Sequence, residues 1–350
     1  MGDISRIVVY REPDGTVHEV ASPPISNVPT DLLRSDLGIP DYVDLDSPPL
    51  GRAAASIWAA VKAPESLHNV PERNKIDGPL FPLLMGGGAV KMLCPIANAR
   101  PSPLNRSIHD LDFIVPKNQG GKFVLLLSLL SGVAGTRYHH FLTSSDKRFN
   151  AIRAGDRYRI RAVDWPPEGQ PSVTWVDVLV DKIEMRHNIP IKEEFPRARS
   201  NMYTIGPEKL FVSKCQLISD YDKKDMGLVQ QNGLESRVLD YPHFKEDKFI
   251  MGMEEKDMLD VCSLLHDRGD AMSLEKLKAE LKDQKFLLTV RLNLKNLISR
   301  MGWMKKKGLS EEQKNTIGQA GERILAGLPT VDKEWSKPWW NTDVDTPLVT

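Results

Sequence analysis

The chain has 350 residues, of which 41% are hydrophobic and 27% charged, so it can bury a core large enough for two or three lobes. Lysine plus arginine and aspartate plus glutamate number 47 each, which excludes a chain-wide field that would attract nucleic acid or an anionic membrane. The three cysteines, Cys94, Cys215 and Cys262, are far apart, a usage typical of unlinked thiols in a reducing compartment.

The first residues of the chain predict a cytoplasmic protein. The sequence Met-Gly-Asp-Ile-Ser-Arg-Ile-Val-Val-Tyr lacks the apolar core of a secretion signal. The longest apolar run, around Phe123 to Leu130, is too short to span a bilayer, so we expect no membrane partner.

Residues 1–75 predict an N-terminal hairpin followed by an irregular segment. Alternating runs from Ile7 to Val20 flank the turn Pro13-Asp14-Gly15, as in two antiparallel strands. Prolines and aspartates from Ala21 to Pro49 predict an irregular connection, and the alanine-rich run Arg52 to Lys62 predicts a helix.

Residues 76–205 predict a catalytic core in which short strands alternate with helices. Two alternating runs separated by Pro166-Pro167-Glu168-Gly169 predict an antiparallel hairpin. The predicted strands are Leu83 to Met85, Leu111 to Val115, Arg157 to Val163 and Val173 to Val180, and the predicted helices are Ala89 to Leu93 and Lys122 to Leu130.

Residues 206–330 predict a helical domain, and residues 331–350 an irregular tail. The amphipathic stretches are Glu208 to Tyr221, Glu254 to His266, Ser273 to Leu281, Leu287 to Met301 and Ser310 to Leu328. The charged residues of Glu254 to Asp260 predict a solvated face. The order of elements predicts an α+β fold, a mixed sheet flanked by helices with a mainly helical C-terminal region.

Three aspartates are the candidate metal ligands. Asp110 and Asp112 occupy positions i and i+2 of a predicted strand, so they share a face. The predicted hairpin could bring Asp177 beside Asp112, and three carboxylates that meet need protons or a divalent cation. The alternative is a pair of solvated acids on an edge strand.

A glycine triplet and one lysine are the candidate phosphate ligands. Gly86, Gly87 and Gly88 follow an apolar strand and begin a helix, where backbone N–H groups can approach a phosphate, although a simple tight turn is the alternative. Lys214 lies among hydrophobic residues, where it must either extend toward solvent or meet a negative partner.

The order of these motifs resembles the nucleotidyltransferase superfamily with a polymerase-beta-like core. The likeness covers about residues 80 to 230 and is closest to the branch of abortive-infection, type IV toxin enzymes. Its elements are Gly86-Gly87-Gly88-Ala89, Arg106-Ser107-Ile108-His109-Asp110-Leu111-Asp112, Val176-Asp177-Val178-Leu179, and a helix carrying Pro207, Leu210, Lys214 and a later Lys224-Asp225.

The resemblance implies a nucleotidyltransferase-like fold and an enzyme that transfers a nucleoside monophosphate from a nucleoside triphosphate, such as ATP, to a hydroxyl-bearing acceptor with release of pyrophosphate. It implies that the catalytic residues, which also bind magnesium or manganese, are Asp110, Asp112 and Asp177, and that the nucleotide is bound by Gly86, Gly87, Gly88, Arg106 and Lys214.

Several alternatives stay open at this point. The acceptor could be RNA, a protein or a small molecule, and the base preference, a cognate antitoxin and the oligomeric state are unspecified. A catalytically inactive nucleotide-binding or protein-interaction module of the same fold is the alternative function. A metal-dependent phosphohydrolase would need histidine ligands that the sequence does not offer near the carboxylates.

Overall fold

The structure is a computed structural model in which contacts divide the chain into two compact units. The first unit comprises Met1–Met92, Ile108–Lys182 and Pro190–Ile205, and the second comprises Leu93–Ser107, Ile183–Ile189 and Gly206–Thr350. The residues described are 6–11, 17–22, 30–61, 76, 78–130, 138–141, 144–153, 155–164, 172–185, 187–196, 203–216, 253, 255–299, 301 and 308–331.

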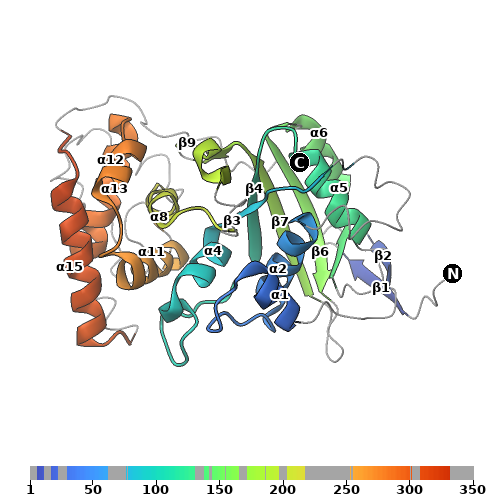
Figure 1. The fold of residues 1–350 in the computed structure, drawn as a ribbon, viewed down its shortest axis with the longest axis horizontal. Helices are drawn as coiled ribbons and strands as arrows, with labels where there is room; N and C mark the ends of the chain where they lie inside the picture. Colours follow the sequence, from blue (N-terminus) through green and yellow to red (C-terminus); the bar gives the residue numbers. More distant parts are fainter. Residues whose placement is uncertain are drawn as a thin grey trace. The chain divides into compact units, whose positions relative to one another are not determined.

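A five-stranded mixed sheet forms the centre of the first unit, with strand order β3-β4-β7-β6-β5 (Figure 1). Strands β4 and β7 are parallel and the other neighbours are antiparallel, so the predicted hairpin of β6 and β7 is confirmed. The bounds are β3 Leu83–Met85, β4 Asp110–Val115, β5 Tyr138–Phe141, β6 Arg157–Asp164 and β7 Ser172–Val180.

One face of this sheet is apolar and carries the core of the first unit. Its alternating positions are fully buried, among them Leu111, Phe113, Val176, Val178 and Ile160. Helix α5, Gly120–Leu130, packs on this face, where the rings of Phe113 and Phe123 meet edge to face at 5.3 Å between centroids. Helix α2, Pro48–Val61, contacts α5 and β4. The alternation of side chains therefore places Asp112, Asp177 and Arg159 on the opposite face, which also carries the buried Ile114 and Leu179.

The N-terminal part of the first unit holds the predicted hairpin and one helix that the sequence did not predict. Strands β1, Arg6–Arg11, and β2, Val17–Ser22, pair antiparallel. Helix α1, Thr30–Leu37, lies within the stretch predicted to be irregular, so that prediction is wrong there. Its buried Leu33 and Leu37 are spaced i, i+4, and Gly38 follows at φ +61°, as at many helix C-termini.

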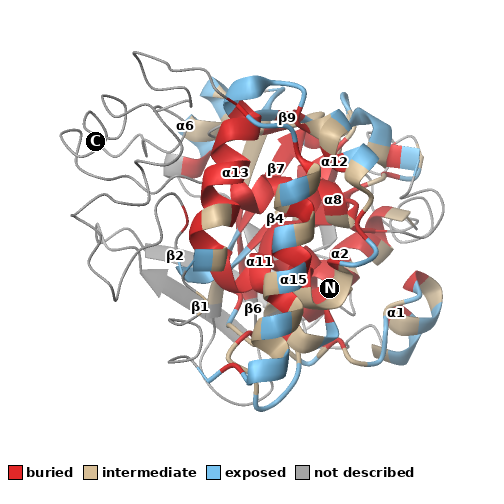
Figure 2. Ribbon diagram, turned by 90° about the vertical axis from the view of Figure 1, so that its left-hand side faces the viewer, coloured by how far each residue is buried: buried red, intermediate tan, exposed pale blue. Residues whose placement is uncertain are grey.

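The second unit contains the predicted helices of the C-terminal half: α8 Pro207–Cys215, α11 Glu255–Arg268, α12 Leu274–Glu280, α13 Gln284–Ser299 and α15 Glu311–Gly327. Figure 2 shows α11 and α13 largely buried, whereas α15 alternates between buried and exposed residues. The α15 N-terminus has a capping box, in which Ser310 and Gln313 exchange side-chain-to-backbone hydrogen bonds. The α+β class, with a mixed sheet flanked by helices and a mainly helical C-terminal region, is confirmed.

Smaller elements complete the described chain. Strands β8, Lys182–Glu184, and β9, Asn188–Pro190, form a two-stranded sheet, and 3-10 turns cover Pro95–Ala97 and Lys192–Glu194. The predicted irregular tail from 332 onward and the Lys224-Asp225 step lie outside the described residues. Within the described ranges, none of the helices is both long and apolar enough to traverse a lipid bilayer.

The apolar face predicts a large cost for truncating Phe113. Phe113→Ala removes a ring with no exposed surface and should lower the free energy of unfolding by about 3–5 kcal/mol. The matched control is Leu32→Ala, because Leu32 is 40% exposed on α1 of the same unit and should change the free energy by no more than about 0.5 kcal/mol. Urea unfolding measures both, and equal losses would contradict this assignment of the core.

Candidate functional site

A row of residues crosses four strands of the sheet and brings together the predicted site residues of the first unit. Met85 on β3 pairs with Asp112 on β4, Asp112 pairs with Asp177 on β7, and Asp177 pairs with Arg159 on β6. Side chains of such laterally paired residues point to the same face. Asp112 and Asp177 are therefore neighbours, as the sequence predicted.

The positions two residues away along each strand belong to the same face. Asp110, Trp175 and Arg161 form the next row, and Arg157 lies two residues before Arg159 on β6. We call this surface the polar face and define it by Asp110, Asp112, Arg157, Arg159, Arg161, Trp175 and Asp177. Aspartates thus lie on β4, arginines on β6, and Asp177 between them on β7.

Two arginines bind the carboxylate of Asp177. Arg159 donates from Nε to Oδ1 at 2.8 Å and from Nη2 to Oδ2 at 2.9 Å, and Arg157 donates from Nη2 to Oδ2 at 2.7 Å. Asp177 is only 9% exposed, whereas Asp112 is half-buried and Asp110 is exposed. The sequence predicted that protons or a divalent cation would neutralise the three carboxylates, and in the structure two guanidinium groups neutralise Asp177.

The arginines change the ionisation of this carboxylate. Burial by itself would raise the pKa of Asp177, but the hydrogen bonds and charges of Arg159 and Arg157 outweigh burial and hold that pKa below its usual value. Because the folded-state pKa lies below the unfolded-state value, the ion pairs stabilise the fold at neutral pH, and this stabilisation is lost as the pH falls through the lowered pKa.

The glycine triplet begins helix α4, Gly86–Leu93, directly at the end of β3. Gly86 has φ +63°, and a Cβ atom there would collide with Oδ2 of Asp112. Glycine at position 86 therefore suits both the positive φ and the close approach to this carboxylate, whereas a larger residue would require the Asp112 side chain to shift. Gly87 and Gly88 are buried in the first turn of α4, where N–H groups lack intrahelical acceptors.

The three predicted metal ligands do not close into a metal centre of their own. Across the described part of the chain, no three His, Cys, Asp or Glu side chains gather in a group that could hold a metal ion. Asp110, Asp112 and Asp177 share one face, but both oxygens of Asp177 accept hydrogen bonds from arginines. The metal-binding role of these aspartates stays a prediction.

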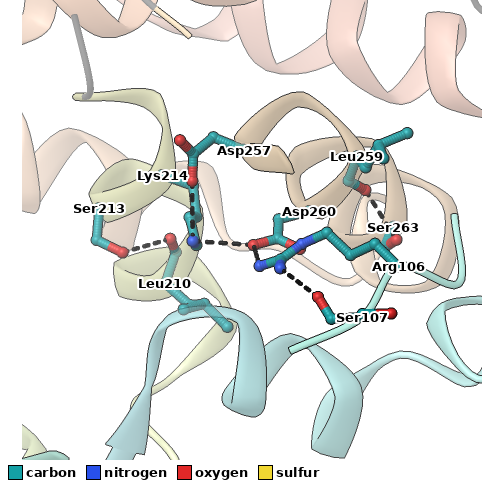
Figure 3. A network of polar contacts seen from close by, with 9 residues as sticks. All are labelled: Arg106, Ser107, Leu210, Ser213, Lys214, Asp257, Leu259, Asp260 and Ser263. Carbon is teal, nitrogen blue, oxygen red and sulfur yellow. Dashed lines mark hydrogen bonds and ion pairs between the residues drawn. The ribbon is translucent and has the colours of Figure 1, made fainter. Parts of the chain in front are cut away.

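Lys214 and Arg106, the other two predicted nucleotide ligands, meet in the second unit (Figure 3). The Nζ atom of Lys214 on α8 lies 3.0 Å from Asp257 Oδ1 and 2.9 Å from Asp260 Oδ2, both on α11. Arg106 binds Asp260 with two donors, Nε at 2.8 Å and Nη2 at 2.7 Å. Of the two interpretations of Lys214, a negative partner is confirmed and extension toward solvent is wrong.

Burial and charge act in opposite directions in this network. Burial would lower the pKa of Lys214, but Asp260 and Asp257 raise it above its usual value. Burial also raises the pKa of Asp257, whereas Lys214 and Arg106 overcome burial at Asp260 and keep its pKa low. The four side chains therefore form a balanced set of two cations and two carboxylates that joins α8, α11 and the segment before β4.

Sequence reasoning missed four residues of these two clusters. Asp257 and Asp260 were predicted to be solvated, but they are 1% and 3% exposed because α11 turns them toward Lys214. Arg157 and Arg159 were treated only as strand residues. The alternation Arg157-x-Arg159-x-Arg161, opposite a strand carrying Asp177, was the signal that could have indicated an arginine-bound carboxylate.

Comparison with known proteins gives no family assignment. No family model and no curated protein matches the sequence. A solved structure from H. pylori, provisionally described as a nucleotidyltransferase, aligns with TM-score 0.38 and 13% identity over 80% of this chain and 95% of that chain. The JHP933 protein of Helicobacter pylori aligns with TM-score 0.38 and 14% identity over 79% of this chain and 92% of its own. Overlap at this level carries no functional argument.

The contact between Gly86 and Asp112 predicts an unequal response to the same substitution at two glycines. Gly86→Ala should lower the free energy of unfolding by about 1–2 kcal/mol for its positive φ, and further because the methyl group displaces the Asp112 carboxylate. Gly38→Ala is the matched control, since Gly38 has φ +61° and open space around it. Its free energy of unfolding should fall only by the amount due to the positive φ. Denaturant unfolding compares the two, and an equal loss would contradict the contact.

The buried network predicts that Lys214 is needed for stability. Lys214→Met leaves two buried carboxylates with one guanidinium and should lower the free energy of unfolding by about 3–5 kcal/mol. Adding Asp257→Asn to this variant removes one excess negative charge and should recover part of the loss. Urea unfolding tests both variants, and a Lys214→Met protein as stable as the wild type would refute the structural role.

Proposed function

We propose that the protein transfers a nucleoside monophosphate from a nucleoside triphosphate to a hydroxyl-bearing acceptor and releases pyrophosphate. One observation carries the proposal: the Gly86 turn, Asp112 and Asp177 occupy one row across neighbouring strands, with Asp110 on the same face. The resemblance of the sequence motifs to nucleotidyltransferases supports the same reaction.

The glycine turn would hold phosphate through the backbone. The N–H groups at the start of α4 and the positive end of its dipole favour an anion there. The lack of a side chain at Gly86 lets these groups lie close to the Asp112 carboxylate, so a phosphate held here would be near a proposed metal ligand. Phosphoryl-group chemistry depends mainly on positioning and electrostatics, and the turn together with Asp110 and Asp112 would supply both.

Asp110 and Asp112 fit one magnesium or manganese ion. Magnesium is usually bound by one or two carboxylates together with phosphates of the substrate, so two aspartates on one face provide a sufficient set of hard oxygen donors. Such an ion would neutralise charge on the phosphate groups. Asp177 does not fit as a ligand in this arrangement, because two arginines occupy its oxygens.

The remaining parts of the proposal rest on the sequence. Nucleotide binding by Arg106 and Lys214, ATP as donor, RNA, a protein or a small molecule as acceptor, and a cytoplasmic location stay predictions. Both cations bind buried aspartates in the structure, so a nucleotide contact would have to be made in addition to those ion pairs.

A second candidate function is a catalytically inactive nucleotide-binding or protein-interaction module. The observation that favours it is the state of Asp177, whose charge is neutralised within the protein by Arg157 and Arg159. A module that only binds nucleotide has no need of a third carboxylate at a metal. The two functions differ in whether pyrophosphate is released.

Transfer is tested by incubating the purified full chain with each α-labelled nucleoside triphosphate, magnesium or manganese, and pools of RNA, protein and small hydroxylated acceptors. We expect label to enter one pool and pyrophosphate to appear. Asp112→Asn should slow label transfer and pyrophosphate release by at least about 100-fold, because it removes a negative charge from the proposed metal site.

The matched control is Asp46→Asn, taken from Asp44-Leu45-Asp46, a second Asp-x-Asp triplet that lies outside the sheet. This variant should transfer at the wild-type rate. Metal-dependent nucleotide binding without pyrophosphate release in any pool would favour the inactive module, and release that persists in Asp112→Asn would refute the assigned site.

A further inference from the structure

The third aspartate of the motif set binds arginines, and this changes the role that it can play. We infer that Asp177 is a positioning residue that holds the Arg159 guanidinium in the row that also contains Asp112, and that Arg159 offers its remaining donors to the phosphate groups of the substrate. The inference rests on the proposed function and deepens it, because it assigns a polyphosphate ligand to Arg159.

Asp177 has most of its hydrogen-bonding capacity in use. A carboxylate offers about four acceptor sites, and three are taken by Nε and Nη2 of Arg159 and Nη2 of Arg157. A cation bound at the same oxygens would have to displace charge-assisted hydrogen bonds of 2.7 to 2.9 Å. Asp177 is therefore committed to its arginines.

Arg159 is held in place by contacts to its side chain and its backbone. Its guanidinium carbon lies 4.9 Å from the ring centroid of Phe149 and 5.3 Å from that of Trp175, both within cation–π range. Asn150 lies on α6, Ser144–Ile152, and its side chain binds both backbone polar groups of Arg159. It accepts a hydrogen bond from the N–H at 2.6 Å and donates one to the carbonyl oxygen at 2.8 Å. The guanidinium is thus set in place before any ligand arrives.

Positive charge and hydrogen-bond donors remain after these contacts are made. One carboxylate and two guanidinium groups leave a net charge of +1 on Asp177, Arg157 and Arg159. Arg159 retains 29% side-chain exposure, and its Nη1 has no hydrogen-bond partner among the described residues. A guanidinium held through Nε and Nη2, with the Nη1 donors remaining, suits the planar recognition of phosphate oxygens.

Strand register places Arg159 in line with the other candidate site residues. Arg159, Asp177 and Asp112 are consecutive members of one row, and Gly86 lies against Asp112 at its far end. A polyphosphate bound at the glycine turn could therefore extend along this row toward a fixed positive charge. Arg161 belongs to the same strand and face but pairs with Asp146 at 3.2 Å instead of Asp177. Arg161 consequently provides a matched control.

The experiment measures two ligands separately on the full chain: Mn²⁺ by electron paramagnetic resonance, and inorganic pyrophosphate without metal by calorimetry. Arg159→Gln should weaken pyrophosphate binding about tenfold and leave Mn²⁺ affinity within about twofold. Arg159→Lys should bind pyrophosphate more tightly than Arg159→Gln, because lysine keeps the positive charge but lacks the planar donors of the guanidinium group. Arg161→Gln should weaken pyrophosphate binding by less than about twofold, and thermal unfolding verifies that each variant is folded.

Asp177→Asn separates the two roles of the aspartate. As a positioning residue it should weaken pyrophosphate binding and leave Mn²⁺ affinity unchanged, whereas Asp112→Asn should weaken Mn²⁺ binding. Loss of Mn²⁺ binding in Asp177→Asn would overturn the inference in favour of a metal ligand. Unchanged pyrophosphate binding in Arg159→Gln, or an equal loss in Arg161→Gln, would overturn it in favour of a purely structural ion pair.

These readouts do not depend on nucleotidyl transfer. If the expected binding pattern is found and no acceptor pool yields pyrophosphate, the inference stands and the transferase proposal fails. If the wild type transfers nucleotide but Arg159→Gln binds pyrophosphate normally, the transferase stands and the inference fails. A wild type that binds no pyrophosphate overturns the inference as well.

Discussion

The polar face depends on the neutralisation of one buried carboxylate. Asp177 lies in an inner strand of the sheet, where an unpaired charge would be costly, and three charge-assisted hydrogen bonds from β6 offset that cost. The same bonds fix Arg157 and Arg159, join β6 to β7 beyond the backbone ladder, and determine which charges remain on the polar face. The stability of the strand pair and the electrostatics of the candidate site thus rest on one set of contacts.

Opposite charges are separated across the face by the strand order. Because β7 lies between β4 and β6, the aspartates of β4 are neighbours of Asp177 and the arginines of β6 lie on its other side. The glycine turn at the end of β3 completes the row on the acidic side. A ligand carrying both a cation and phosphate groups would find an acidic and a basic region within one row, which is why nucleotide chemistry is the proposed function.

The second unit uses the same physical principle for a different purpose. Lys214, Arg106, Asp257 and Asp260 balance one another in a buried setting and join segments that are far apart in sequence. Motif residues can therefore have a structural role that sequence resemblance alone does not indicate. Removing one member of such a set is costly because it leaves an uncompensated charge, whatever further contact the set makes with a ligand.

The sequence by itself determined four of the five strands of the central sheet, most helices, the β6–β7 hairpin and the glycine turn, because periodicity and turn residues are local properties of the chain. Asp177 lies beside Asp112 because β4 and β7 pair in parallel, which is a contact between distant segments. Helix α1 was not predicted, because its eight residues are flanked by prolines and aspartates, which are typical of irregular segments. Only the tertiary structure decided which charges pair. The partners Arg159 with Asp177 and Lys214 with Asp257 come from different elements, and their contact depends on strand register and helix rotation, which no local pattern of residues specifies.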